Sequence, residues 1–78
     1  MNDFGWHNSG RAISLMIPPL VYADITRSFR TGYWLLRLSI VPQDPREEIK
    51  VHQEYETLGE AKRFAEERIV RARLEGKI

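Results

Sequence analysis

Two histidines and two pairs of neighbouring glutamates are the residues of this sequence that could do chemistry. His7 lies in a segment rich in Gly, Asn and Ser, and His52 lies in the alternating stretch IKVHQEY. The pairs Glu47–Glu48 and Glu66–Glu67 are adjacent in the chain, and adjacent carboxylates do not converge on one atom as a catalytic pair must. The sequence has no cysteine, which excludes disulfides, thiolate metal ligands and cysteine nucleophiles.

Motifs that carry catalysis in other proteins are missing. The sequence has no glycine-rich phosphate loop, no G-x-S-x-G elbow and no histidine pair at metal-ligand spacing. For His52 the simplest interpretation is a side chain that faces solvent from a strand. We therefore expect a protein that is not an enzyme and that holds no metal and no cofactor.

Length and composition predict one small folded domain. A chain of 78 residues buries only about 60% of its unfolded surface, so a second domain or a deep cleft would not fit. Apolar residues make up 42% and charged residues 29%, as in folded rather than disordered chains. The net charge of +1 is low for a dedicated nucleic-acid binder, although a local basic patch can still bind.

The most apolar early run, residues 13–23, is interrupted by Pro18-Pro19. It is shorter than the roughly 20 residues that a membrane-spanning helix needs. We therefore expect a cytoplasmic protein with no membrane partner.

The opening MNDFGWHNSG predicts a flexible N-terminal arm over residues 1–10, with a single domain over 11–78. Phe4 and Trp6 are unusual in such an arm. Large aromatic side chains there either fold back over an uncovered apolar patch or contact a partner. The sequence leaves both alternatives open.

Three segments alternate with period two, which is typical of half-buried strands: residues 20–30, 33–41 and 49–55. Thr31-Gly32 predicts a tight turn between the first two, and PQDPREE predicts a turn before the third. Residues 11–17 are a possible fourth strand.

The most clearly predicted element is a C-terminal amphipathic helix. Thr57 and Glu60 have the spacing of a capping box, and Gly76 is placed to end the helix. Between them, apolar residues recur every three or four positions. The predicted fold class is α+β: an antiparallel sheet of three, possibly four, strands with this helix packed on one face.

The helix can cover one sheet face only, so we expect it on the face with the larger apolar side chains. That face is predicted to hold Val21, Ile25, Phe29, Trp34, Leu36, Leu38, Ile40, Ile49 and Val51. The other, open face is predicted to hold Tyr22, Thr26, Ser28, Arg30, Tyr33, Leu35, Arg37, Lys50 and His52, with Asp24 and Glu54 as its acids. Such a face is either an ordinary hydrated surface or a binding surface, and tyrosine and arginine favour binding.

One family pattern resembles this layout. The motif G-Y-W-L-L-R-L at residues 32–38, followed by I-K-V-H-Q-E-Y at 49–55 and T-L-G-E-A-K-R-F-A at 57–65, is similar to the DNA-binding domains of phage integrase arm-binding and plant AP2 type. The resemblance implies a sheet whose outer face enters the major groove, with Arg30, Arg37 and Lys50 as groove or phosphate contacts. In size and style the chain is also similar to small phage-encoded inhibitors such as anti-CRISPR proteins.

The sequence therefore predicts a small binding protein that acts on a macromolecule, with a protein partner favoured and duplex DNA as the alternative. The predicted contacts come from the open face and the arm: Tyr22, Arg30, Tyr33, Arg37, Lys50, His52, Phe4 and Trp6. A homodimer formed through an exposed strand edge is also possible.

Overall fold

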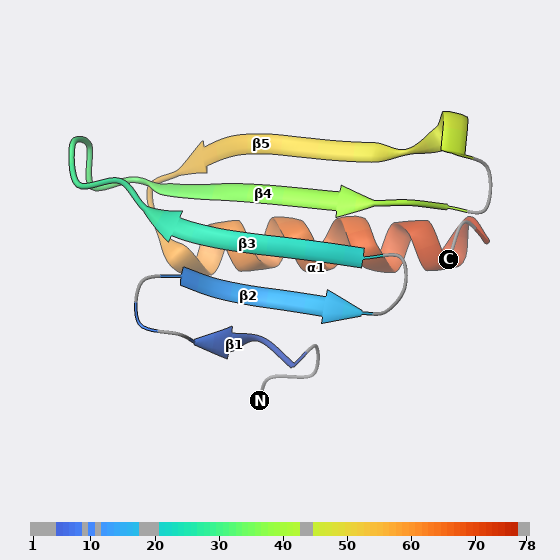
Figure 1. Ribbon diagram of the computed structural model, residues 1–78, viewed down its shortest axis with the longest axis horizontal. Helices are drawn as coiled ribbons and strands as arrows, with labels where there is room; N and C mark the ends of the chain where they lie inside the picture. The colour runs from blue at the N-terminus through green and yellow to red at the C-terminus, as the bar shows by residue number, and fades with distance from the viewer. Residues whose placement is uncertain (1–4, 9, 11, 18–20, 43–44, 77–78) are drawn as a thin grey trace.

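The described strands form one antiparallel sheet with a long α-helix behind it (Figure 1). The computed structural model describes residues 5–8, 10, 12–17, 21–42 and 45–76. The strands, in chain and spatial order, are β1 (His7–Asn8), β2 (Ala12–Ile17), β3 (Val21–Arg27), β4 (Trp34–Ile40) and β5 (Ile49–Tyr55). A short 3-10 helix, η1 (Pro45–Glu47), precedes β5, and helix α1 spans Leu58–Leu74.

The prediction of an α+β fold is confirmed, but the predicted number of strands is wrong, since the described residues form a sheet of five. β2 is the possible fourth strand, and its alternation buries Ile13 and Leu15 while Met16 stays exposed. β1 is the fifth, and it lies within the segment expected to be a flexible arm. Two residues are too few to show a period, so its pairing with β2 left no signal in the sequence.

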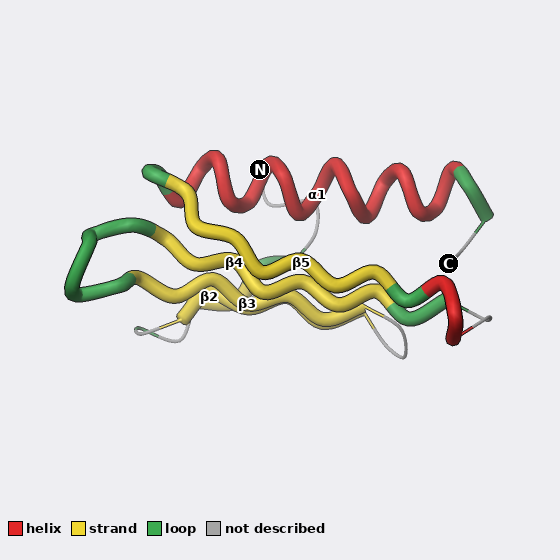
Figure 2. The backbone as a smooth tube through the Cα atoms, turned by 90° about the horizontal axis from the view of Figure 1, so that it is seen from above, coloured by secondary structure: helices red, strands yellow, loops and turns green. Residues whose placement is uncertain are grey.

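Helix α1 begins and ends where its capping residues predict. The Glu60 backbone N–H donates to the Thr57 Oγ1 atom at 3.1 Å, and Gly76 has φ of 74°, the left-handed conformation that ends many helices. Figure 2 shows the helix running along one side of the sheet, where it contacts β3, β4 and β5. Its buried face consists of Ala61, Ala65, Ile69 and Ala72.

The core lies between α1 and the sheet. Its buried members from the strands are Ile13, Leu15, Val21, Ala23, Ile25, Leu36, Leu38 and Ile40. Trp34, Ile49 and Val51 pack against this cluster but are only partly buried, because they lie near the margins of the sheet. Small alanines on the helix let it approach the branched side chains of the strands closely.

Phe29 contradicts its predicted place in the core, since it is fully exposed. β3 ends at Arg27, two residues before it, so the alternation that would have turned Phe29 inward has already stopped. Residues 28–33 form the β3–β4 turn, in which the Gly32 N–H donates to the Ser28 carbonyl at 2.8 Å. This turn projects beyond the end of the sheet (Figure 1).

Within the described part of the chain, no helix has both the length and the apolar composition needed to cross a membrane.

Candidate interaction surface on the open face of the sheet

Strand register lines up the side chains of the open face in rows across the sheet. The central row runs from β2 to β5 through Ser14, Asp24, Arg37 and His52, and the pairing of β1 with β2 adds His7 beside Ser14. A second row holds Met16, Tyr22, Ser39 and Lys50. Residues directly opposite on neighbouring strands have Cβ atoms only about 5 Å apart, so each row forms a continuous strip of neighbours.

A shallow depression of about 340 Å³ lies where these two rows cross β4 and β5. It is lined by Tyr22 of β3, residues 37–39 of β4 and residues 50–52 of β5. Arg37 of β4 and Lys50 and His52 of β5 therefore present hydrogen-bond donors around one hollow. A carboxylate or a backbone carbonyl of a partner is the chemical group that such donors bind best.

Tyr22 is held in place by its neighbour along β3. Its hydroxyl donates to the Asp24 Oδ2 atom at 3.3 Å. The negative charge of Asp24 raises the pKa of Tyr22, with partial burial and the hydrogen bond adding to the effect and the charge of Arg37 opposing it. The phenol therefore stays protonated at neutral pH and remains available as a donor, with 44% of the side chain exposed.

Opposite charges face each other at the centre of the open face, where Asp24 and Arg37 are register partners. The Asp24 Oδ1 atom is shielded from solvent and has no hydrogen-bond partner among the described residues. Arg37, in contrast, is exposed. Arg37 is thus more accessible from solvent than Asp24.

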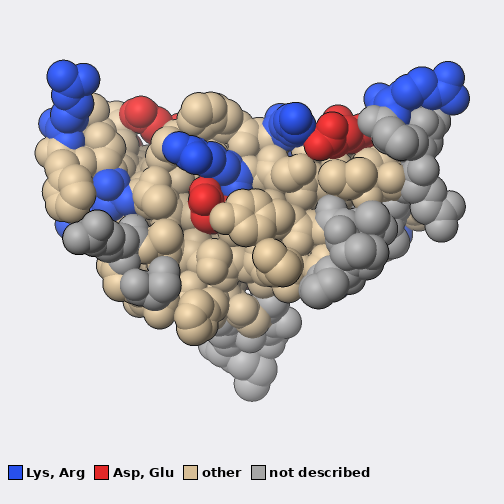
Figure 3. Space-filling view, viewed as in Figure 1, with Lys and Arg blue, Asp and Glu red and all other residues tan. Residues whose placement is uncertain are grey.

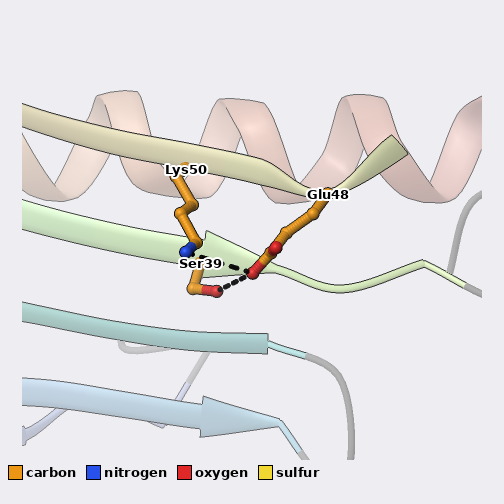
Figure 4. A network of polar contacts seen from close by, with 3 residues as sticks. All are labelled: Ser39, Glu48 and Lys50. Atoms are coloured by element: carbon orange, nitrogen blue, oxygen red, sulfur yellow. Dashed lines mark hydrogen bonds and ion pairs between the residues drawn. The ribbon is translucent and has the colours of Figure 1, made fainter. Parts of the chain in front are cut away.

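A second charged cluster lies at the end of β4 and the start of β5 (Figure 4). The Ser39 hydroxyl donates to the Glu48 Oε1 atom at 3.5 Å, and Lys50 Nζ lies 3.8 Å from the same oxygen. The Lys50 side chain is 74% exposed, so this ion pair contributes at most about 1 kcal/mol to stability. Lys50 can therefore exchange Glu48 for a partner's acid at little cost.

Charges of both signs alternate over the upper half of the open face, where β4 and β5 run, while the described residues of the lower half are largely uncharged (Figure 3). Arg37 and Lys50 are accompanied by the acids Asp24, Glu48 and Glu54 in or beside this half of the face. The result is a mixed surface rather than a uniformly basic one.

The sequence-predicted contact residues fall into three groups. Tyr22, Arg37, Lys50 and His52 share the depression. Arg30 and Tyr33 lie on the β3–β4 turn instead of the sheet face. Trp6 is partly buried and packs against the core, as expected if the N-terminal segment folds back on the domain, while Phe4 lies outside the described residues.

Sequence reasoning missed three residues of this surface. Met16, 66% exposed, lies beside Tyr22, and its place follows from the alternation of residues 12–17. Phe29 lies at the exposed turn, and the nearby Thr31-Gly32 was the available signal that the strand had ended. Glu48 joins the face through its contact with Ser39, which only the fold reveals.

Among the residues that the structure describes, no three histidine, aspartate or glutamate side chains gather as a metal site would require. Comparison with protein-family models, with curated protein sequences and with solved structures finds no match to this chain.

Proposed function

We propose that this chain is a non-catalytic binding protein that contacts a protein partner through the open face of its sheet, with the β3–β4 turn beside it. The observation that carries the proposal is the one-sided packing of α1. It leaves a sheet face with Tyr22, Arg37, Lys50 and His52 around one hollow and no described element over them. A protein of this kind acts by covering a surface of its partner, as a small inhibitor or accessory subunit does.

The residue types on this surface support a protein partner. Tyrosine and arginine contribute strongly to protein interfaces because they bring large area and several hydrogen bonds at modest entropic cost. Tyr22 is already oriented by Asp24, which lowers the entropy that it loses on binding. Met16, exposed beside it, adds an adaptable apolar contact.

The β3–β4 turn supplies a second set of contacts. Phe29 and Tyr33 are exposed there, and Arg30 lies between them. The turn is stiffened by its own hydrogen bonds, since Ser28 N–H donates to the Tyr33 carbonyl at 2.8 Å and Tyr33 N–H donates to Thr31 Oγ1 at 3.2 Å. A stiff projecting turn with an aromatic tip fits an apolar pocket on a partner.

Charge argues against duplex DNA as the target. Phosphate binding requires an excess of cations, and on this face Asp24, Glu48 and Glu54 offset Arg37 and Lys50. Each of these acids would repel a phosphate backbone, whereas a protein surface of mixed charge can pair with both signs.

Affinity capture from cells that carry the gene tests the proposal. The double variant Tyr22→Ala/Arg37→Glu should lose the partner, because both side chains line the hollow. Arg63→Glu on α1 is the matched control, since it makes the same charge change at an exposed residue of the helix. Equal recovery of the same partner by the wild type and the double variant would rule out the open face.

A gel-shift titration with random duplex DNA at low salt tests the alternative. We expect no shift at micromolar protein. The contrary result is a shift whose underlying affinity falls steeply with salt, with a log–log slope of about −0.9 per phosphate contacted. If Arg37→Ala also weakens that binding, the partner is DNA and not a protein.

A further inference from the structure

The two edges of the sheet differ in length. β1, at one edge, has two residues, whereas β5, at the other, has seven. β5 is hydrogen-bonded to β4 alone among the described strands, so half of its backbone N–H and C=O groups point to an unpaired edge. Figure 2 looks onto this edge, with α1 running along one side of it.

The β5 edge lacks two of the features that usually prevent strand pairing, proline and a bulge. Its sequence, IKVHQEY, contains no proline. Each of its residues has one partner on β4, from Ile40–Ile49 to Trp34–Tyr55, so no bulge interrupts the strand. A long, regular, unpaired edge is a template for another strand.

The sequence of β5 is complementary to itself when read in the opposite direction. If two copies pair antiparallel about a two-fold axis at His52, the middle residue of the strand, Lys50 of each copy lies opposite Glu54 of the other. Opposite charges directly across a strand pair stabilise it, and like charges destabilise it. Symmetry makes this contact twice, once on each side of the axis.

The same register also pairs apolar residues at both ends of the strand on the helix side of the sheet. Ile49 of each copy then lies opposite Tyr55 of the other, on the side of the sheet that α1 covers. Both side chains are only partly buried within one chain, as is Phe64 of α1, whose ring centroid lies 5.7 Å from that of Tyr55. Pairing would cover this apolar margin, which supplies the hydrophobic contribution that charge pairs alone lack.

We propose that the β5 edge is a homodimer interface, in which two copies of this chain join their sheets through antiparallel β5 strands centred on His52. The two helices then lie on the same side of one continuous sheet, and the two open faces form one surface on the other. The proposal goes beyond the proposed function, because it rests on the backbone edge of β5; Lys50 is the residue that the two surfaces share.

Charge reversal tests the proposal and its register. The wild type should be dimeric by sedimentation equilibrium between about 5 and about 300 µM, while Lys50→Glu and Glu54→Lys should each weaken the dimer at least about tenfold. The double variant Lys50→Glu/Glu54→Lys restores both opposite-charge pairs, so its dimer should return. An equimolar mixture of the two single variants should form a heterodimer for the same reason.

Glu56→Lys is the matched control, because Glu56 is exposed and lies just beyond β5. In the proposed register residue 56 lies opposite Glu48 of the other copy, so this variant should dimerise at least as strongly as the wild type. An alternative register has its axis one residue further along, at Gln53, and pairs Lys50 with Glu56 and His52 with Glu54. In that register the double variant Lys50→Glu/Glu54→Lys would stay dissociated. Glu56→Lys would then weaken the dimer. That result would overturn the proposed register. A wild type that is monomeric throughout, or single variants that dimerise unchanged while circular dichroism shows a native fold, would overturn the interface.

Discussion

The two faces of the sheet are built from the same strands and differ in almost everything else. On the helix side, Ala23, Ile25 and Leu36 are fully buried. On the open side, their chain neighbours Asp24 and Arg37 meet at the centre of a charged row. The contrast shows how strand period separates two surfaces: one face provides the buried core, and the other can carry polar and charged side chains without disturbing that core.

The largest expected effect comes from two adjacent leucines of β4. Leu36 is fully buried, whereas Leu35 is partly exposed on the open face. Leu36→Ala should lower the free energy of unfolding by about 3 kcal/mol, because it leaves a cavity under α1. Leu35→Ala should cost less than about 1 kcal/mol. Urea denaturation of both variants measures the difference, and equal losses would mean that the two faces are not separated as described.

A somewhat smaller effect is expected from enlarging a helix residue at the core. Ala65 is fully buried where α1 meets the sheet. Ala65→Leu should destabilise the protein by about 2 kcal/mol, since the added carbons have no space and force the helix outward. Val70→Leu is the control, because Val70 is 42% exposed on the helix and should tolerate the change. An unchanged free energy of unfolding for Ala65→Leu would show that α1 packs against the sheet more loosely than the full burial of Ala65 indicates.

The helix cap should contribute less again. Thr57→Ala removes the acceptor for the Glu60 N–H and should cost about 1 kcal/mol. Thr57→Ser retains an acceptor at this position and should restore most of the loss. Thermal denaturation followed by circular dichroism distinguishes the two, and an equal melting temperature for wild type and Thr57→Ala would contradict the capping interaction.

The smallest effect on stability is expected at the centre of the open face. Arg37 is exposed, so Arg37→Ala should change the free energy of unfolding by less than about 0.5 kcal/mol. The same variant should bind the partner more weakly. If Arg37→Ala instead lowers the free energy of unfolding strongly, its loss of binding would follow from unfolding, and Arg37 would not belong to the binding surface.

The sequence predicts the parts of this fold that depend on local period and capping. Alternation separates Leu36 from Arg37, and the Thr57 to Gly76 segment begins and ends as its residues indicate. Phe29 was placed wrongly because period two cannot tell where a strand stops and a turn begins. The short strand β1 was missed because it exists only through pairing with β2.

The arrangement of the candidate surface depends on register, which the sequence does not specify. Alternation places Arg37 and His52 on one face but does not say that they are opposite each other. Turn lengths and the packing of all strands under α1 decide that pairing. For the same reason Glu48, a turn residue, could not be assigned to Ser39 in advance.

Site-specific photo-crosslinking in cells tests the central claim most directly. A benzophenone amino acid placed at Tyr22, on the open face, is compared with one at Val70, on α1; the two native side chains have nearly equal exposure, 44% and 42%. A protein adduct from position 22 and none from position 70 is the predicted result. Adducts from position 70 and none from position 22 would contradict the account, because the helix would then be the binding surface and the open sheet face an ordinary hydrated one.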